Sequence, residues 1–257
     1  MSERFPPESP VAMKVFPSPN HGERRDGRRP TMLVLHYTGM PDEDEALQWL
    51  CDPISQVSAH YFVFADGRIL QLVPEARRAW HAGVSSWDGE TDLNSSSIGI
   101  EISNPGHPGG LPPFPDAQIG AVIGLAKDLA TRWRIAPERV LAHSDVAPGR
   151  KLDPGEVFPW ERLHRAGVGH WVAAAPIRDG RFFARGNRGI PVEALQAMLA
   201  MYGYGLRITG IFDEETEKVV AAFQRHFRPE RVDGVADAST ITTLRDLIAR
   251  RPGAPAR

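Results

Sequence analysis

The hydrophobic pattern of the first part of the chain indicates two strands that end in reactive side chains. Residues 32–35 are apolar throughout, and His36 follows them directly. A continuous apolar run is typical of a strand buried on both faces. Residues 97–103 alternate instead, with three isoleucines on one face and Glu101 on the other. Because side chains switch faces with a period of two, Glu101 is expected to point away from the aliphatic core.

Two helical patterns accompany these strands. Asp42 and Glu45 form a capping-box pattern ahead of an apolar face, which predicts a short helix after the first strand. Pro115 and Asp116 precede a 3.6-residue apolar repeat that continues to Trp133. This repeat predicts the longest helix of the region.

A hairpin signal decides the kind of sheet. Residues 60–64 and 68–73 are apolar segments separated by an Asp-Gly turn at 66–67, which predicts two antiparallel strands. An antiparallel pair excludes an all-parallel sheet. The predicted fold class is therefore α/β, with a mixed central β-sheet flanked by helices and a small C-terminal three-helix domain.

The pattern divides the chain into five parts. Residues 1–29 are rich in proline, arginine and glycine, which predicts an arm over the surface. The main domain is expected at 30–171, and residues 172–188, which lack periodicity, are expected to be a linker between two separate cores. Three short apolar stripes, punctuated by glycines, predict a three-helix domain at 189–250. Residues 251–257 are expected to form a frayed tail.

Composition excludes several function classes. The 30 basic and 32 acidic residues leave a net charge of −2, so charge gives no support for nucleic-acid binding. The sequence has no apolar run of the roughly 18 residues that a membrane span needs. Cys51 is the single cysteine and is expected to be a small core residue. The N-terminus lacks the apolar run of a secretory signal, which predicts a cytoplasmic protein, with the periplasm as the alternative.

The richest chemistry lies in the bent loop at 141–154, which contains His143, Lys151 and Asp153. His143 and Asp153, together with His36, offer the three protein ligands of a hydrolytic zinc site. Lys151 could stabilise an oxyanion, and the strand glutamate could transfer protons. Taken singly, each residue also fits a plain structural role, such as a solvated lysine or a strand glutamate facing water. Asp145 competes with Asp153 for the ligand position.

Five segments carry a stronger signal because they occur in a fixed order. They are Val34–Thr38 (VLHYT), Ser58–Tyr61 (SAHY), Arg78–Gly83 (RAWHAG), Ser97–Ile102 (SIGIEI) and His143–Gly155 (HSDVAPGRKLDPG). Over residues 30–165 the chain resembles the zinc-dependent N-acetylmuramoyl-L-alanine amidases of the type-2 amidase, or peptidoglycan-recognition-like, family.

The resemblance implies a role for each matching residue. It implies that His36, His143 and Asp153 bind Zn²⁺, that Glu101 is the general acid/base, and that Lys151 is the transition-state cation. It favours Asp153 over Asp145 as the third ligand. The implied reaction is hydrolysis of the amide between the lactyl group of N-acetylmuramic acid and L-alanine of the stem peptide.

Five further residues are expected near the substrate. Trp80 could cover a sugar or peptide face, although a packed core tryptophan is nearly as good an interpretation, and His81 could donate a hydrogen bond in the cleft. His60 could contact substrate or could orient other site residues. Asn104 and Arg150 are expected to contact polar substrate groups because they adjoin the site motifs.

The C-terminal part resembles a small three-helix peptidoglycan-binding domain. The matching positions include Leu195-Gln196, Tyr202–Tyr204, Gly210–Phe212, Ala222–Gln224 and Asp233-Gly234. The alternative is a helical appendage that only packs on the catalytic domain.

These observations favour one function and leave others open. The leading hypothesis is a cytoplasmic amidase of peptidoglycan recycling that acts on muropeptides, including 1,6-anhydro forms. A periplasmic wall-remodelling amidase acting on intact peptidoglycan is the alternative, and a functional wall-binding module would favour it. A non-catalytic muropeptide-binding protein would need to have lost a zinc ligand, and all five residues are present. A structural wall protein would not explain the site in the main domain.

Overall fold

A computed structural model of the 257-residue chain describes residues 5–251 and gives it a mixed α/β architecture. The strands are β1 (Lys14–Val15), β2 (His21–Glu23), β3 (Met32–Tyr37), β4 (Tyr61–Val63), β5 (Ile69–Gln71), β6 (Arg77–Ala79), β7 (Ser97–Ile102) and β8 (Val140–Ala142). The α-helices are α1 (Glu43–Cys51), α2 (Leu93–Ser96), α3 (Asp116–Trp133), α4 (His143–Val146), α5 (Trp160–Arg165), α6 (Ile190–Tyr202), α7 (Glu214–Phe227) and α8 (Ala238–Ala249). Three short 3₁₀ turns are Arg25–Gly27, His107–Gly109 and Pro137–Arg139.

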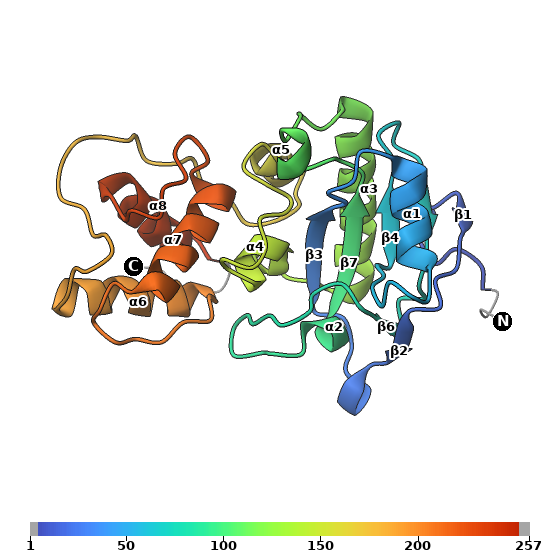
Figure 1. Ribbon diagram of the computed structural model, residues 1–257, viewed down its shortest axis with the longest axis horizontal. Coiled ribbons are helices and arrows are strands. Elements are labelled where there is room, and N and C mark those ends of the chain that lie inside the picture. The colour runs from blue at the N-terminus through green and yellow to red at the C-terminus, as the bar shows by residue number, and fades with distance from the viewer. Residues whose placement is uncertain (1–4, 252–257) are drawn as a thin grey trace.

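The main sheet has six strands in the order β1-β5-β4-β7-β3-β8. Strand β3 lies between β7 and β8 and is parallel to both, whereas β4 and β5 are antiparallel across the predicted Asp-Gly turn. Strand β1 pairs with β5 in parallel at one edge. The predicted mixed sheet is confirmed, and helices lie on both sides of it (Figure 1).

The predicted helices of the main domain are also confirmed. The Asp42 side chain accepts a hydrogen bond from the backbone amide of Glu45 at 2.9 Å, which caps α1. The long helix α3 begins at Asp116 and buries its apolar stripe against the sheet. Cys51 is partly buried against the core cluster that includes Leu47 and Leu50. It has the packing role that the sequence predicts.

The two faces of β3 are buried against different partners. Leu33 and Leu35 pack in the cluster that contains α3. Met32 and Val34 point the other way, into a cluster that also holds apolar residues of α6, α7 and α8. These three helices lie beside the β3 side of the sheet (Figure 1). The C-terminal helices therefore share a hydrophobic core with the sheet, whereas separate cores were expected, and the domain boundaries themselves stay predictions.

The prediction that the N-terminal segment is an arm outside the packed structure is wrong for residues 5–29. This segment supplies the edge strand β1 and strand β2, which pairs with β6. Arg24 is only 7% exposed, and its guanidinium donates to the carbonyls of Glu75, Ser95 and Ser97. Backbone pairing and a buried cation thus tie the segment to the sheet. Residues 1–4 lie outside the described part, as do 252–257 of the predicted tail.

No helix within residues 5–251 combines the length and the hydrophobicity that crossing a membrane requires.

Candidate active site

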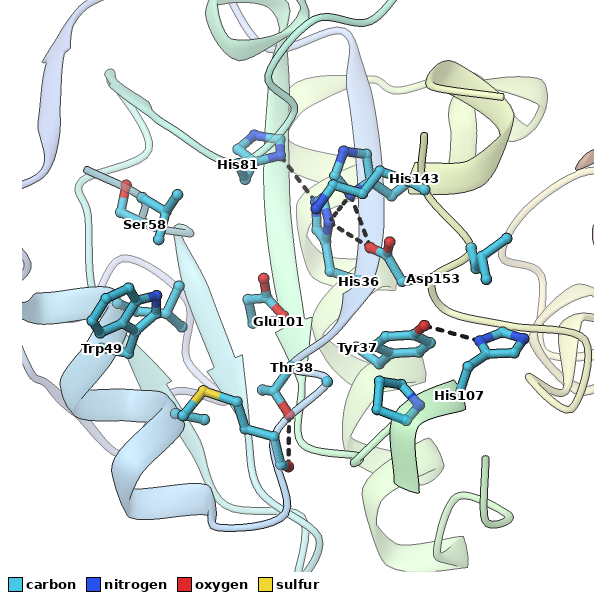
Figure 2. Close-up of a pocket in the computed structure, with 18 of the residues that line it drawn as sticks. His36, Tyr37, Thr38, Trp49, Ser58, His81, Glu101, His107, His143 and Asp153 are labelled. Atoms are coloured by element: carbon cyan, nitrogen blue, oxygen red, sulfur yellow. Dashed lines mark hydrogen bonds and ion pairs between the residues drawn. The ribbon is translucent and has the colours of Figure 1, made fainter. Parts of the chain in front are cut away.

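Three side chains with metal-binding atoms meet at one edge of the sheet. His36 lies near the end of β3, His143 begins α4 directly after β8, and Asp153 lies in the loop that follows. Because β3 and β8 are parallel neighbours, their carboxyl ends open at the same edge. The Nδ1 atoms of the two histidines are 2.9 Å apart, and Asp153 Oδ2 is 3.0 Å from His36 Nδ1 and 2.9 Å from His143 Nδ1 (Figure 2).

The hydrogen bond made by His143 Nε2 determines which ring nitrogen carries the proton. Nε2 lies 3.1 Å from the backbone oxygen of Ala82. A carbonyl oxygen can only accept, so Nε2 carries the hydrogen and neutral His143 presents the lone pair of Nδ1 to the cluster.

His81 determines which ring nitrogen of His36 carries the proton. The Ser97 hydroxyl donates to the carbonyl of Leu93, so its oxygen accepts from His81 Nε2, which lies 3.2 Å away. His81 Nδ1 is then free to accept from His36 Nε2 at 3.0 Å. His36 therefore also turns the lone pair of Nδ1 toward the cluster. Two imidazole nitrogens and one carboxylate oxygen converge with their lone pairs inward, a donor set that fits a zinc ion.

The electrostatics of the cluster favour unprotonated ligands. Burial, reinforced by nearby His143, lowers the pKa of His36 to about 4. For Asp153 burial acts in the opposite direction, but the charge and hydrogen bonds of the two histidines outweigh it and hold its pKa below the ordinary value. The resulting neutral imidazole and carboxylate are the forms that bind metal ions.

Glu101 lies beside the cluster and is suited to proton transfer. Its Oε2 is buried and has no hydrogen-bond partner among residues 5–251. Burial raises the pKa of Glu101 well above its usual value, the negative charge of Asp153 adds to this effect, and the positive charge of Lys151 opposes it. A carboxyl group with a raised pKa can take up and release a proton near neutral pH.

A pocket of about 560 Å³ brings the predicted residues together. Its lining includes the three cluster residues, Glu101 and Lys151. Trp80, His81 and Arg150 also line it. The five residues expected to carry the chemistry therefore share one cavity.

Two residues that were expected to contact substrate, His81 and Arg150, bond to other groups of the protein. His81 is buried and hydrogen-bonded to His36, so it orients a cluster residue. The Arg150 guanidinium donates to the carbonyls of Ala82 and Val84, which holds the loop between β6 and α2 against the pocket.

The structure does not support substrate contacts for Asn104 and His60, and neither lines the pocket within the described part of the chain. The Asn104 amide donates to the carbonyl of Pro112, and its oxygen accepts from the backbone of Gly106. His60 Nδ1 accepts from the backbone amide of Gly99. Both side chains are buried and stabilise their own surroundings.

Several pocket residues were missed in the sequence. They are Tyr37, Thr38, Gly39, Met40, Trp49, Val57, His107, Pro108 and Leu152, among others. Trp49 had a recognisable signal, because it falls off the buried face of α1 and is 49% exposed despite its size. His107 had none, since it reaches the pocket through a hydrogen bond of 2.9 Å with Tyr37 that sequence spacing does not reveal.

Asp145, the competing ligand, points away from the cluster. Its carboxylate accepts from the backbone amide of Ala142 at 2.8 Å and from the Tyr204 hydroxyl at 2.7 Å. His226 Nδ1 also donates to it at 2.6 Å. The bonds to Tyr204 and His226 attach the carboxylate to the C-terminal part of the chain.

Comparisons with known proteins identify relatives of both parts of the chain. The profile of the N-acetylmuramoyl-L-alanine amidase family matches residues 26–156, and that of a putative peptidoglycan binding domain matches residues 188–244. The N-acetylmuramoyl-L-alanine amidase AmiD of Escherichia coli is 44% identical over 234 residues, which cover 85% of this chain and 82% of AmiD.

Two solved structures resemble most of the chain. The E. coli AmiD complex with the substrate anhydro-N-acetylmuramic acid-L-Ala-D-γ-Glu-L-Lys superposes with a TM-score of 0.74 at 42% identity, covering 86% of this chain and 90% of that one. AMPDH3 from Pseudomonas aeruginosa, in complex with anhydromuramic pentapeptide, gives a TM-score of 0.71 at 34% identity and covers 86% and 92%. With the profile match over residues 26–156, this similarity shows that the chain belongs to the N-acetylmuramoyl-L-alanine amidase family.

Proposed function

We propose that the protein is a zinc-dependent amidase that cleaves the amide between N-acetylmuramic acid and L-alanine of the stem peptide. The observation that carries this proposal is the convergence of His36 Nδ1, His143 Nδ1 and Asp153 Oδ2 in the pocket that also contains Glu101. The substrate in the AmiD complex and the anhydromuramic pentapeptide in the AMPDH3 complex support the same bond as the target.

His36, His143 and Asp153 would hold the zinc ion. When bound, zinc supplies Lewis acidity, which polarises a carbonyl group and makes water a better nucleophile at neutral pH. The outer bonds to His81 and Ala82 keep the two imidazoles in the orientation that this role requires.

Glu101 and Lys151 would perform the proton transfer and the charge stabilisation. Ionised Glu101 accepts a proton from the attacking water and then delivers it to the nitrogen of L-alanine as that nitrogen leaves. Its raised pKa favours the protonated form that makes the second transfer. The Lys151 ammonium, on the same pocket wall, would stabilise the negative charge that grows on the attacked carbonyl oxygen.

We further propose that soluble anhydromuropeptides, rather than intact wall, are the preferred substrates. Both solved relatives named above hold anhydromuropeptides. The peptidoglycan-binding profile match at 188–244 favours polymeric peptidoglycan as the alternative substrate. The cytoplasmic location stays a prediction from the sequence.

The test is to incubate zinc-loaded protein separately with an anhydromuropeptide and with intact sacculi, and to detect released stem peptide by mass spectrometry. A chelated sample and Glu101→Gln serve as controls. We expect metal-dependent release from the anhydromuropeptide. Release from sacculi alone would assign the protein to wall remodelling. No release from either substrate by metal-loaded protein would overturn the proposal and favour a binding protein.

A further inference from the structure

The short helix α4 controls the position of two proposed metal ligands. His143 is its first residue. The backbone amide of the next residue, Ser144, donates to the carbonyl of Asp153 at 3.0 Å, so the loop that carries the second ligand is attached to the same turn. A helix of four residues has too few internal hydrogen bonds to keep its own orientation. Something outside α4 must hold it in place.

The side chain of Asp145 provides that attachment, and its partners belong to the C-terminal part of the chain. Asp145 is 0% exposed. One of its oxygens accepts from the Tyr204 hydroxyl, and the other from His226 Nδ1 on α7 and from the amide of Ala142 at the start of α4. Figure 1 shows α7 alongside α4. A buried carboxylate needs such donors because it has lost its water.

The partners of Asp145 are themselves fixed. The His226 ring stacks on Trp160 at 3.8 Å between ring centroids, and Tyr204 packs edge-on against Trp87 at 4.9 Å. Both residues are buried. Their donor atoms therefore have fixed positions around the carboxylate, and a shift of α4 relative to them would strain these bonds.

We propose that Tyr204 and His226 are positioning residues of the metal site, which act through Asp145 to hold α4 where His143 and Asp153 converge. The C-terminal helical unit then has a role in the active site itself, in addition to any binding of peptidoglycan. This inference rests on the metal ligands proposed above.

The test compares full-length variants that lose only the donors. Tyr204→Phe combined with His226→Phe keeps an aromatic ring at both positions and removes both bonds to Asp145. Tyr202→Phe is the matched control, because the Tyr202 hydroxyl is equally buried in the same unit but bonds His170 at 2.9 Å, away from α4. The readouts are the rate of zinc loss to a coloured chelator and the visible absorption spectrum of the Co²⁺-loaded protein.

We expect the double variant to lose zinc about tenfold faster than the unaltered protein and to change the Co²⁺ spectrum, because loss of a supporting bond weakens metal sites by about that factor. Tyr202→Phe should match the unaltered protein in both. His226→Asn, which offers an amide donor near the position of Nδ1, should restore slow zinc loss when compared with His226→Phe.

A double variant that matches Tyr202→Phe in both readouts would overturn the inference. If the double variant does not fold, Tyr204→Phe alone is compared with Tyr202→Phe, and equal rates and spectra would again overturn it. If the unaltered protein binds neither zinc nor Co²⁺, the proposed metal site fails first and the inference fails with it. That result is distinct from normal metal binding in all variants, which contradicts the positioning role alone.

Discussion

His36 and Glu101 are register partners on the adjacent parallel strands β3 and β7. Register partners project from the same face of a sheet, so a proposed metal ligand and the proposed proton-transfer group start from neighbouring points on a rigid surface. The loop residues Lys151 and Asp153 are then added above this fixed pair. Two of the five proposed site residues therefore lie on a loop that is built over a pair fixed by the sheet.

Replacing Glu101 with glutamine should abolish most turnover and leave the metal site intact. The substitution keeps the shape of the side chain but removes the group that transfers protons, which is worth on the order of 10²–10⁴ in rate. Zinc content, measured by atomic absorption, should equal that of the unaltered protein. Undiminished release of stem peptide would remove Glu101 from the mechanism.

His143→Ala should lose both the metal ion and the activity. Two ligand atoms would remain of the three that converge, and a catalytic zinc site commonly uses three protein ligands. The control is His164→Ala, because His164 is exposed on α5 and away from the pocket. Equilibrium dialysis should show zinc retained by the control and lost by His143→Ala. Zinc retained by both at the same level would contradict the ligand assignment.

The stability of the metal-free protein should depend on pH through Glu101. Its pKa lies above the ordinary value of 4.5, so the folded state binds this proton more tightly than the unfolded chain. The resulting stability is fully present below the ordinary pKa and is lost as pH rises through the raised one. Glu101→Gln should therefore unfold at higher urea concentration than the unaltered protein at about pH 8, with the difference shrinking toward about pH 4. An equal difference at both pH values would contradict the raised pKa.

Trp49→Ala should weaken substrate binding with little effect on the chemical step. The indole lines the pocket opposite the ligand cluster and is half exposed, so it is available to cover a sugar or peptide face (Figure 2). We expect KM to rise about tenfold and kcat to stay close to normal, in line with the energy of an aromatic contact. Ile54→Ala is the control, since Ile54 is exposed nearby but lies outside the pocket lining. A loss of kcat with unchanged KM would place Trp49 in a different role.

The part of the fold that depends on local periodicity could be predicted from the sequence. Strand β7 shows its alternation because one face enters the core and the other faces the site. Strand β3 shows none, because both faces are buried. From such patterns the mixed sheet and the helices α1 and α3 could be predicted. The apolar run of β3 does not say what packs on its second face, and the cluster on that face includes residues of helices more than 150 residues away.

The residues in and around the candidate site also fall into two groups, those that could be predicted from the sequence and those that could not. His36, Glu101 and the residues of the 143–153 loop were predictable because they belong to ordered motifs at strand ends. The burial of Arg24 was not, since arginine is ordinarily a surface residue and its carbonyl acceptors lie 51 to 73 positions along the chain. The internal hydrogen bonds of Asn104 and His60 depend on tertiary contacts in the same way.

The hydrophobic core shared by β3 and the C-terminal helices has a thermodynamic consequence. Removing the helical unit would uncover Trp87 and Trp160, which are 1% and 5% exposed and pack on Tyr204 and His226, at a cost of about 25 cal/mol for each Å² of apolar surface exposed. The two parts of the chain should therefore melt together, as a single calorimetric transition whose van 't Hoff and measured enthalpies agree. A fragment cut at residue 171 would then be an incomplete and aggregation-prone part of one cooperative unit.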